Sequence, residues 1–212
     1  MKILYIDTSS NYLYSAIANE NSIIGEVKKE FGQSLSEEAL PEIVKLFENN
    51  NLEAKDINKI IVVNGPGSFT GIRIGITIAK TFAWSLNIPI ITISGLEAMM
   101  ISSNKETNYV PMIDARRNYV FAAIYDKEKN TILKPQHIKL DDLEKEFNKL
   151  DNYVIISNDN FEKYENIEKY NPDILKIINY VKNNEPTNPH AVNPEYLKLT
   201  EAEESKLGWL KK

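Results

Sequence analysis

The chain has 212 residues, 42% of them hydrophobic, so it can form one large domain or two small ones around a real core. Its 25 Lys and Arg against 30 Asp and Glu give a net charge of −5, which argues against a protein that grips nucleic acid by itself. There is no Cys, which excludes disulfides, thiol catalysis and Cys-ligated zinc.

The front half of the chain alternates strand-like and helix-like patterns. Three β-rich runs separated by short polar turns predict an antiparallel meander, and helices then alternate with apolar strands. The predicted elements are strands over 2–7, 12–18 and 22–31, a helix over 34–49, a strand over 59–63, a helix over 71–86, a strand over 89–93 and a helix over 94–101. Ser34 and Glu37 predict a capping box for the first helix, in which Pro41 indicates a kink or a later start.

The back half is predicted to form a second, smaller lobe, with no visible internal repeat. Its elements are strands over 109–114, 119–125 and 131–140, a helix over 141–150, a strand over 153–157, a helix over 172–183, a proline-rich crossover over 185–194 and a charged, loosely held tail over 196–212. A boundary near 102–108 divides the chain into lobes 1–104 and 105–212. The order of elements in the front half is similar to the ribonuclease-H-like and actin-like ATPase topology, so the predicted class is α/β with two unequal lobes of that fold.

Asp7-Thr8-Ser9 closes the first predicted strand. In actin-like and ribonuclease-H-like enzymes an acid at this point holds Mg²⁺ or positions phosphates, whereas Asp, Thr and Ser also favour simple turns. Both interpretations stay open. A two-metal nuclease needs several converging carboxylates, and the second natural position carries Asn64, which argues against that class.

The segment from Gly65 to Gly75 is the strongest local motif. Seven of the eight glycines lie in the first 95 residues, and this segment opens a helix, where backbone N–H groups favour an anion. It lacks the Lys of a P-loop, and Thr70 replaces the third glycine of the dinucleotide fingerprint. The alternatives are anion binding and a tight turn with Ser68 or Thr70 as the helix cap. The candidate loop residues are Asp7, Thr8, Gly65, Gly67, Ser68, Thr70, Gly71 and Arg73.

Four motifs resemble the TsaB family, also called YeaZ, of tRNA threonylcarbamoyladenosine biosynthesis proteins. They are Ile6-Asp7-Thr8-Ser9, the Gly65–Gly75 segment, Asp114-Ala115-Arg116 and Pro194-Glu195-Tyr196-Leu197. The resemblance covers essentially the whole chain in order and spacing. One difference is Leu35, which stands before Ser36-Glu37 where the family often has His, so no metal ligand is expected there.

The resemblance implies an actin-like protein without catalysis of its own. Such proteins pair directly with TsaD, the related enzyme that transfers the threonylcarbamoyl group to adenosine 37 of ANN-decoding tRNAs. The ATPase TsaE joins them, TsaC-type enzymes make the threonylcarbamoyl-adenylate, and tRNA is contacted only indirectly through the complex. Self-association as a homodimer through the same surface is also implied. No cofactor is expected on this chain alone, and ATP or ADP at the junction with TsaD stays an open alternative.

The family docks through a helical bundle, so the first two predicted helices are the expected partner interface. Gly75, Ala79 and Ala83 form a stripe of small residues that would let another helix approach closely. The alternative, which is the commoner case for each residue alone, is burial in the chain's own core. The expected interface residues are Leu40, Ile43, Val44, Phe47, Ile72, Gly75, Ile76, Ala79 and Ala83.

The competing hypothesis is a weak nucleotide-binding ATPase that uses Asp7 and the Gly65–Gly71 loop. Only two histidines are present, His137 and His190, and the back half has a single glycine, Gly208, to admit adenine and ribose. These counts favour a scaffold subunit over an enzyme. Because Asp7 interrupts the apolar N-terminus and no apolar run is long enough for a membrane span, we expect a cytoplasmic protein without membrane contact.

Overall fold

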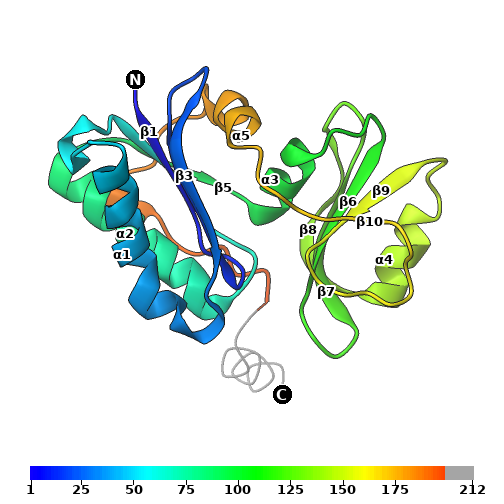
Figure 1. Ribbon diagram of the computed structural model, residues 1–212. Helices are drawn as coiled ribbons and strands as arrows, with labels where there is room; N and C mark the ends of the chain where they lie inside the picture. Colours follow the sequence, from blue (N-terminus) through cyan, green and yellow to red (C-terminus); the bar gives the residue numbers. More distant parts are fainter. Residues whose placement is uncertain (199–212) are drawn as a thin grey trace, which may run out of the picture.

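The protein consists of two α/β lobes, each built on a five-stranded mixed sheet (Figure 1). The computed structural model describes residues 1–198, so most of the predicted tail, residues 199–212, lies outside the described residues. Figure 1 shows α1 and α2 on one face of the first sheet, and α3 and α5 on the face turned toward the second lobe. No described helix is long and apolar enough to cross a membrane.

The first sheet has the strand order β3-β2-β1-β4-β5. β1, β2 and β3 pair antiparallel, as the meander predicts, and β4 and β5 continue the sheet parallel to β1. Each element begins and ends within two residues of its predicted bounds. The elements are β1 (Ile3–Asp7), β2 (Tyr12–Ala18), β3 (Ile23–Glu30), α1 (Leu35–Asn49), β4 (Lys59–Val63), α2 (Phe69–Leu86), β5 (Ile90–Ile93) and α3 (Gly95–Ser102), with 3-10 turns at Gly32–Ser34 and Ala54–Asp56.

At the starts of the two long helices, one predicted cap is absent and another is present. The Ser34 hydroxyl donates to the Phe31 carbonyl at 3.0 Å and makes no capping bond, because a 3-10 turn precedes α1; the predicted capping box is wrong. Pro41 lies inside α1, so the helix does not start later. For α2, Ser68 is the cap: its Oγ accepts from the Gly71 N–H at 3.2 Å.

The second sheet has the strand order β10-β9-β6-β7-β8. The short strand β10 was not predicted, because two residues carry no detectable pattern. The elements are β6 (Asn108–Asp114), β7 (Tyr119–Tyr125), β8 (Thr131–Lys139), α4 (Leu140–Phe147), β9 (Tyr153–Ile156), β10 (Ile167–Glu168) and α5 (Ile174–Val181), with a 3-10 turn at Pro189–Ala191.

The second lobe repeats the strand topology of the first. β6, β7 and β8 pair antiparallel, and β9 and β10 continue parallel to β6, so β6 stands where β1 stands in the first lobe. The repeat is hidden in the sequence because the long helix between β4 and β5 has no counterpart between β9 and β10. As a consequence, Asp7 and Asp114 end equivalent central strands.

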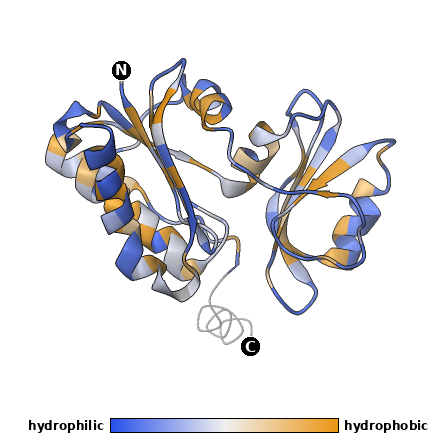
Figure 2. Cartoon of the chain, in the orientation of Figure 1, coloured by the Kyte–Doolittle hydropathy of each residue, from blue (hydrophilic) through white to orange (hydrophobic). Residues whose placement is uncertain are grey.

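The chain returns to the first lobe after β10, which differs from the predicted second lobe of 105–212. α5 packs in the apolar cluster that also holds α3 and one face of the first sheet. Further on, the Thr187 N–H donates to the Ile90 carbonyl at 2.8 Å, and Val192 is buried with α1 and α2. The second lobe keeps its own cluster between its sheet and α4. Figure 2 shows the hydropathy of the two lobes: the strands inside them are mainly hydrophobic, and α4 is hydrophilic on its outer side.

Candidate functional site

The glycine-rich loop between β4 and α2 packs directly on the turn that follows β1. The Ser68 N–H donates to the Ser9 carbonyl at 2.7 Å, and the Thr8 hydroxyl donates to the Gly71 carbonyl at 2.7 Å. A Cβ at Gly67 or Gly71 would collide with the carbonyl oxygen of Ser9 or Thr8, so this approach requires glycine. This close packing is what the tight-turn alternative predicts.

Asp7 is buried and held by its neighbours. Its Oδ1 accepts from the Ser9 N–H at 2.9 Å and from the Ser9 hydroxyl at 2.7 Å, which is the local bonding that the turn interpretation predicts. The Tyr170 hydroxyl lies 3.4 Å from the Asp7 Oδ2 atom. Burial raises the pKa of Asp7, and the hydrogen bonds from Ser9 and Tyr170 oppose that rise. Among residues 1–198 no group of three or more His, Asp or Glu side chains is placed to hold a metal ion.

Replacing Asp7 by Asn should change how stability depends on pH. Because the pKa of Asp7 is raised in the folded state, its contribution to stability is present below the unfolded pKa and is lost as pH rises through the folded pKa. Asn keeps an oxygen for Ser9 and carries no proton to lose. The free energy of unfolding is measured by urea denaturation from about pH 3 to pH 7. The value for Asp7→Asn should increase relative to the value for the unmodified chain as pH rises.

Asp126 provides the matched control for that measurement. Hydrogen bonding from Asn130 lowers the pKa of Asp126, so its stabilising effect is present above the unfolded pKa and is lost as pH falls. Asp126→Asn should therefore lose stability relative to the unmodified chain as pH rises, opposite to Asp7→Asn. Parallel pH curves for the unmodified chain and Asp7→Asn would show that the carboxyl is not perturbed by burial.

Glu195 lies after α5 in the segment that returns to the first lobe, and it contacts the other side of the glycine-rich loop. Its N–H donates to the Asn64 carbonyl at 2.8 Å, and its carbonyl oxygen would lie 2.7 Å from a Cβ at Gly65. Burial, and next the charge of Glu97 on α3, raise the pKa of Glu195. Burial also raises the pKa of Glu97. The charge of Glu97 therefore acts on the Glu195 carboxyl at the first lobe.

Arg73 joins the start of α2 to the returning chain. Its Nε donates to the Tyr196 hydroxyl at 2.7 Å, and its guanidinium carbon lies 3.8 Å from the centre of the Phe69 ring. The rings of Phe69 and Tyr196 stack at 5.2 Å. The structure therefore brings together the Asp7 turn, the glycine-rich loop and the Pro194–Leu197 motif, while Asp114 closes the equivalent strand of the second lobe.

The small-residue stripe of α2 faces inward, so the expectation that it forms an exposed docking stripe is wrong. Ala79 and Ala83 are 0% and 1% exposed, and a Cβ at Gly75 would collide with the Thr8 hydroxyl. The physical reason is that the small side chains let α2 lie close to the first sheet. Four other expected interface residues are buried in the cluster between α1, α2 and that sheet: Ile43, Phe47, Ile72 and Ile76.

The solvent-facing side of α1 and α2 carries a different set of residues. Of the expected residues only Leu40 and Val44 are exposed, at 46% and 44%. Trp84, which was not among the expected residues, is 69% exposed and is the most exposed large hydrophobic residue of the described chain. The spacing i, i+4 and i+7 of Thr77, Thr81 and Trp84 contained the signal, since it places them together opposite the stripe. We call this surface the α1–α2 outer face; it consists of Leu40, Val44, Thr77, Thr81 and Trp84.

Comparison with known proteins places the chain in a family. Residues 10–174 match the family model described as TsaD, tRNA N6-adenosine threonylcarbamoyltransferase. The tRNA threonylcarbamoyladenosine biosynthesis protein TsaB of Bacillus subtilis (strain 168) is 33% identical over 96% of both chains. The protein of the same name from Escherichia coli (strain K12) is 33% identical over 62% of this chain and 58% of its own length.

A solved structure has the same fold. YeaZ from Pseudomonas aeruginosa superposes with a TM-score of 0.74 at 18% identity, covering 92% of this chain and 99% of its own. The ribonuclease-H-like, actin-like fold predicted from the order of elements is confirmed. Together with the 33% identity to the Bacillus protein over 96% of both chains, these findings show that the chain belongs to the TsaB (YeaZ) family of tRNA threonylcarbamoyladenosine biosynthesis proteins.

Proposed function

We propose that this chain is the non-catalytic subunit that pairs with TsaD and activates it in forming N6-threonylcarbamoyladenosine at position 37 of ANN-decoding tRNAs. The observation that carries the proposal is the α1–α2 outer face, where Leu40, Val44 and Trp84 leave apolar surface in water on helices whose other sides are buried. Exposed Trp is the residue type most enriched at the energetic centres of protein interfaces.

The partner is argued from the shared fold. Because residues 10–174 match the TsaD family model, a TsaD enzyme presents helices equivalent to α1 and α2. Two chains of one fold can then pair through equivalent helices about a pseudo-two-fold axis, and the same surface serves self-association as a homodimer. An interface of this kind would bury more than roughly 1,600 Å² in total.

A non-catalytic role is supported by the surroundings of His137, His190 and Asp7. His137 stacks against Tyr119 at 4.6 Å in the second lobe, and His190 lies in the 3-10 turn Pro189–Ala191. Asp7 is engaged by Ser9. TsaE would join the pair in the cytoplasm, and ATP or ADP would bind only at the junction with TsaD.

Substitutions on the α1–α2 outer face should break the pairing without unfolding the chain. Thr77→Glu places a charge at the centre of an apolar contact and should weaken pairing with TsaD at least ~10-fold. Trp84→Ala removes the largest exposed side chain and should weaken it about 30-fold, the effect of losing an interface anchor of roughly 2 kcal/mol. Both are measured by titrating labelled TsaD with each purified variant.

The control is Asn179→Glu on the exposed side of α5, which adds the same charge to a helix on another surface. It should pair like the unmodified chain. Pairing that survives both Thr77→Glu and Trp84→Ala would show that TsaD, if it binds at all, uses another surface.

A further inference from the structure

Two of the three arginines of the chain stand side by side at the turn between β6 and β7. Arg116, Arg117 and Asn118 have positive φ angles of 65°, 54° and 61°, and both arginine side chains are exposed. Within residues 1–198 neither guanidinium forms an ion pair. The turn therefore presents two adjacent guanidinium groups to solvent.

A row of aromatic rings begins next to this turn. Tyr119 and His137 stack with centroids 4.6 Å apart and planes at 12°, and Phe121 lies 5.4 Å from His137. The Lys139 ammonium lies 6.0 Å from the centre of the Tyr119 ring. All four side chains are half-buried or exposed.

The row lies on the sheet face that is turned away from α4. The intervening β7 residues Val120 and Ala122 are buried in the cluster with α4, and side chains alternate along a strand. Phe121 pairs with His137, and Tyr119 with Lys139, in the β7–β8 register, which sets these side chains on one side. We call this surface the basic–aromatic face; it consists of Arg116, Arg117, Tyr119, Phe121, His137 and Lys139.

The nearby carboxylates accept hydrogen bonds from the turn and from the end of β6. Asp114 Oδ1 accepts from the Arg116 N–H at 2.9 Å, and Asp159 Oδ2 accepts from the Asp114 N–H at 2.7 Å. Asp141 accepts from the Asn118 side chain at 3.2 Å. Both arginine side chains remain exposed at this turn, in a chain whose net charge is −5.

We propose that the basic–aromatic face binds an RNA strand with unstacked bases. Guanidinium groups match the geometry of phosphate oxygens, and a ring row beside them offers the faces on which unpaired bases stack. The inference rests on the proposed function, in which the substrate is a tRNA, and goes beyond it by assigning this chain a direct contact with that RNA.

The test uses a fluorescently labelled hairpin RNA with the anticodon loop of an ANN-decoding tRNA. Its affinity is measured by anisotropy at two salt concentrations, for the full chain alone and for the chain with TsaD. Arg116→Glu/Arg117→Glu should weaken binding at least ~10-fold and reduce the salt slope, and Tyr119→Leu should weaken it about 5- to 100-fold with little change in slope. Arg116→Lys/Arg117→Lys should retain most of the salt dependence, because it keeps both charges.

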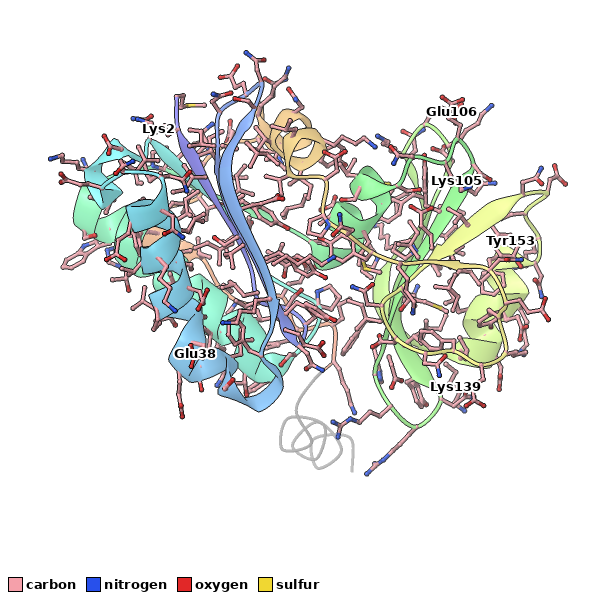
Figure 3. All side chains as sticks on the ribbon, in the orientation of Figure 1. Lys2, Glu38, Lys105, Glu106, Lys139 and Tyr153 are labelled. Carbon is pink, nitrogen blue, oxygen red and sulfur yellow. The ribbon has the colours of Figure 1, made fainter. Side chains whose placement is uncertain are left out.

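The matched control is Lys105→Glu/Lys127→Glu, which makes the same change of charge at the opposite end of the lobe; Figure 3 labels Lys105 at the top and Lys139 at the bottom of that lobe. This variant should bind like the unmodified chain. Equal losses in both double Glu variants, or no RNA binding in either preparation, would overturn the proposal.

Pairing with TsaD is measured on the same variants to separate the two hypotheses. Thr77→Glu should break the pairing and leave the RNA affinity of the isolated chain unchanged. If Arg116→Glu/Arg117→Glu abolishes pairing and leaves RNA affinity unchanged, the face is a protein contact and the RNA proposal is wrong.

Discussion

Ala79→Glu should yield a chain that does not fold, even though a negative charge two residues earlier should be tolerated. Ala79 is 0% exposed and packs between α2 and the first sheet. A carboxylate there would be buried in the apolar cluster, and burying it costs at least ~4 kcal/mol. That is a large part of the stability of a domain, which is about 5–15 kcal/mol in total.

The matched variant is Thr77→Glu, which adds the same charge to the exposed side of the same helix. Circular dichroism and thermal unfolding of the two purified variants measure the difference. We expect cooperative unfolding for Thr77→Glu, and insoluble or non-cooperative protein for Ala79→Glu. An Ala79→Glu protein that unfolds as cooperatively as the unmodified chain would show that the stripe lies in water.

Gly71→Ala should destabilise the chain by about 3 kcal/mol, although alanine normally favours a helix over glycine by ~1 kcal/mol. Gly71 lies in the first turn of α2, and its new methyl group would collide with the Thr8 carbonyl oxygen. That oxygen is backbone and belongs to the turn beside Asp7, so it cannot move without opening the contact between loop and strand end. Urea denaturation measures the loss as a lower midpoint.

Gly95→Ala is the control for this substitution. It makes the same change near the start of α3, where the new methyl group would lie 3.3 Å from the Pro66 carbonyl and 3.5 Å from a Val63 methyl. A small shift of neighbours relieves that contact, so we expect a change of no more than ~1 kcal/mol. Equal midpoints for Gly71→Ala and Gly95→Ala would contradict the direct packing of the loop on the β1 turn.

The sequence predicted the elements well because most of them follow local rules. Short polar turns separate β1 to β3, and apolar, β-branched runs mark β4 and β5. Of the two predicted caps of α2, Ser68 is the one present, and the helix begins two residues before the predicted start. Local rules fail where the outcome depends on distant residues, as for the two-residue strand β10 and for α5, which leaves the second lobe to pack beside α3.

The prediction of an exposed stripe of small residues on α2 was wrong for a physical reason that the sequence does not contain. Gly75, Ala79 and Ala83 permit close approach, but the same spacing serves a neighbouring helix and the helix's own sheet equally well. The fold determines which of these two contacts forms. The stripe faces β1, and Trp84 is exposed to solvent. For the same reason the meeting of Arg73 with Tyr196 could not be predicted, because it joins residues 123 positions apart.

We propose that this chain promotes threonylcarbamoyl transfer through the α1–α2 outer face. The most direct test is a reconstituted assay with TsaD, TsaE, a TsaC-type enzyme, ATP and an unmodified ANN-decoding tRNA, in which the modified nucleoside is quantified. We predict that formation requires the unmodified chain, persists with Asn179→Glu and falls at least ~10-fold with Thr77→Glu. Equal formation with the unmodified chain, with Thr77→Glu and with no chain added would contradict the claim.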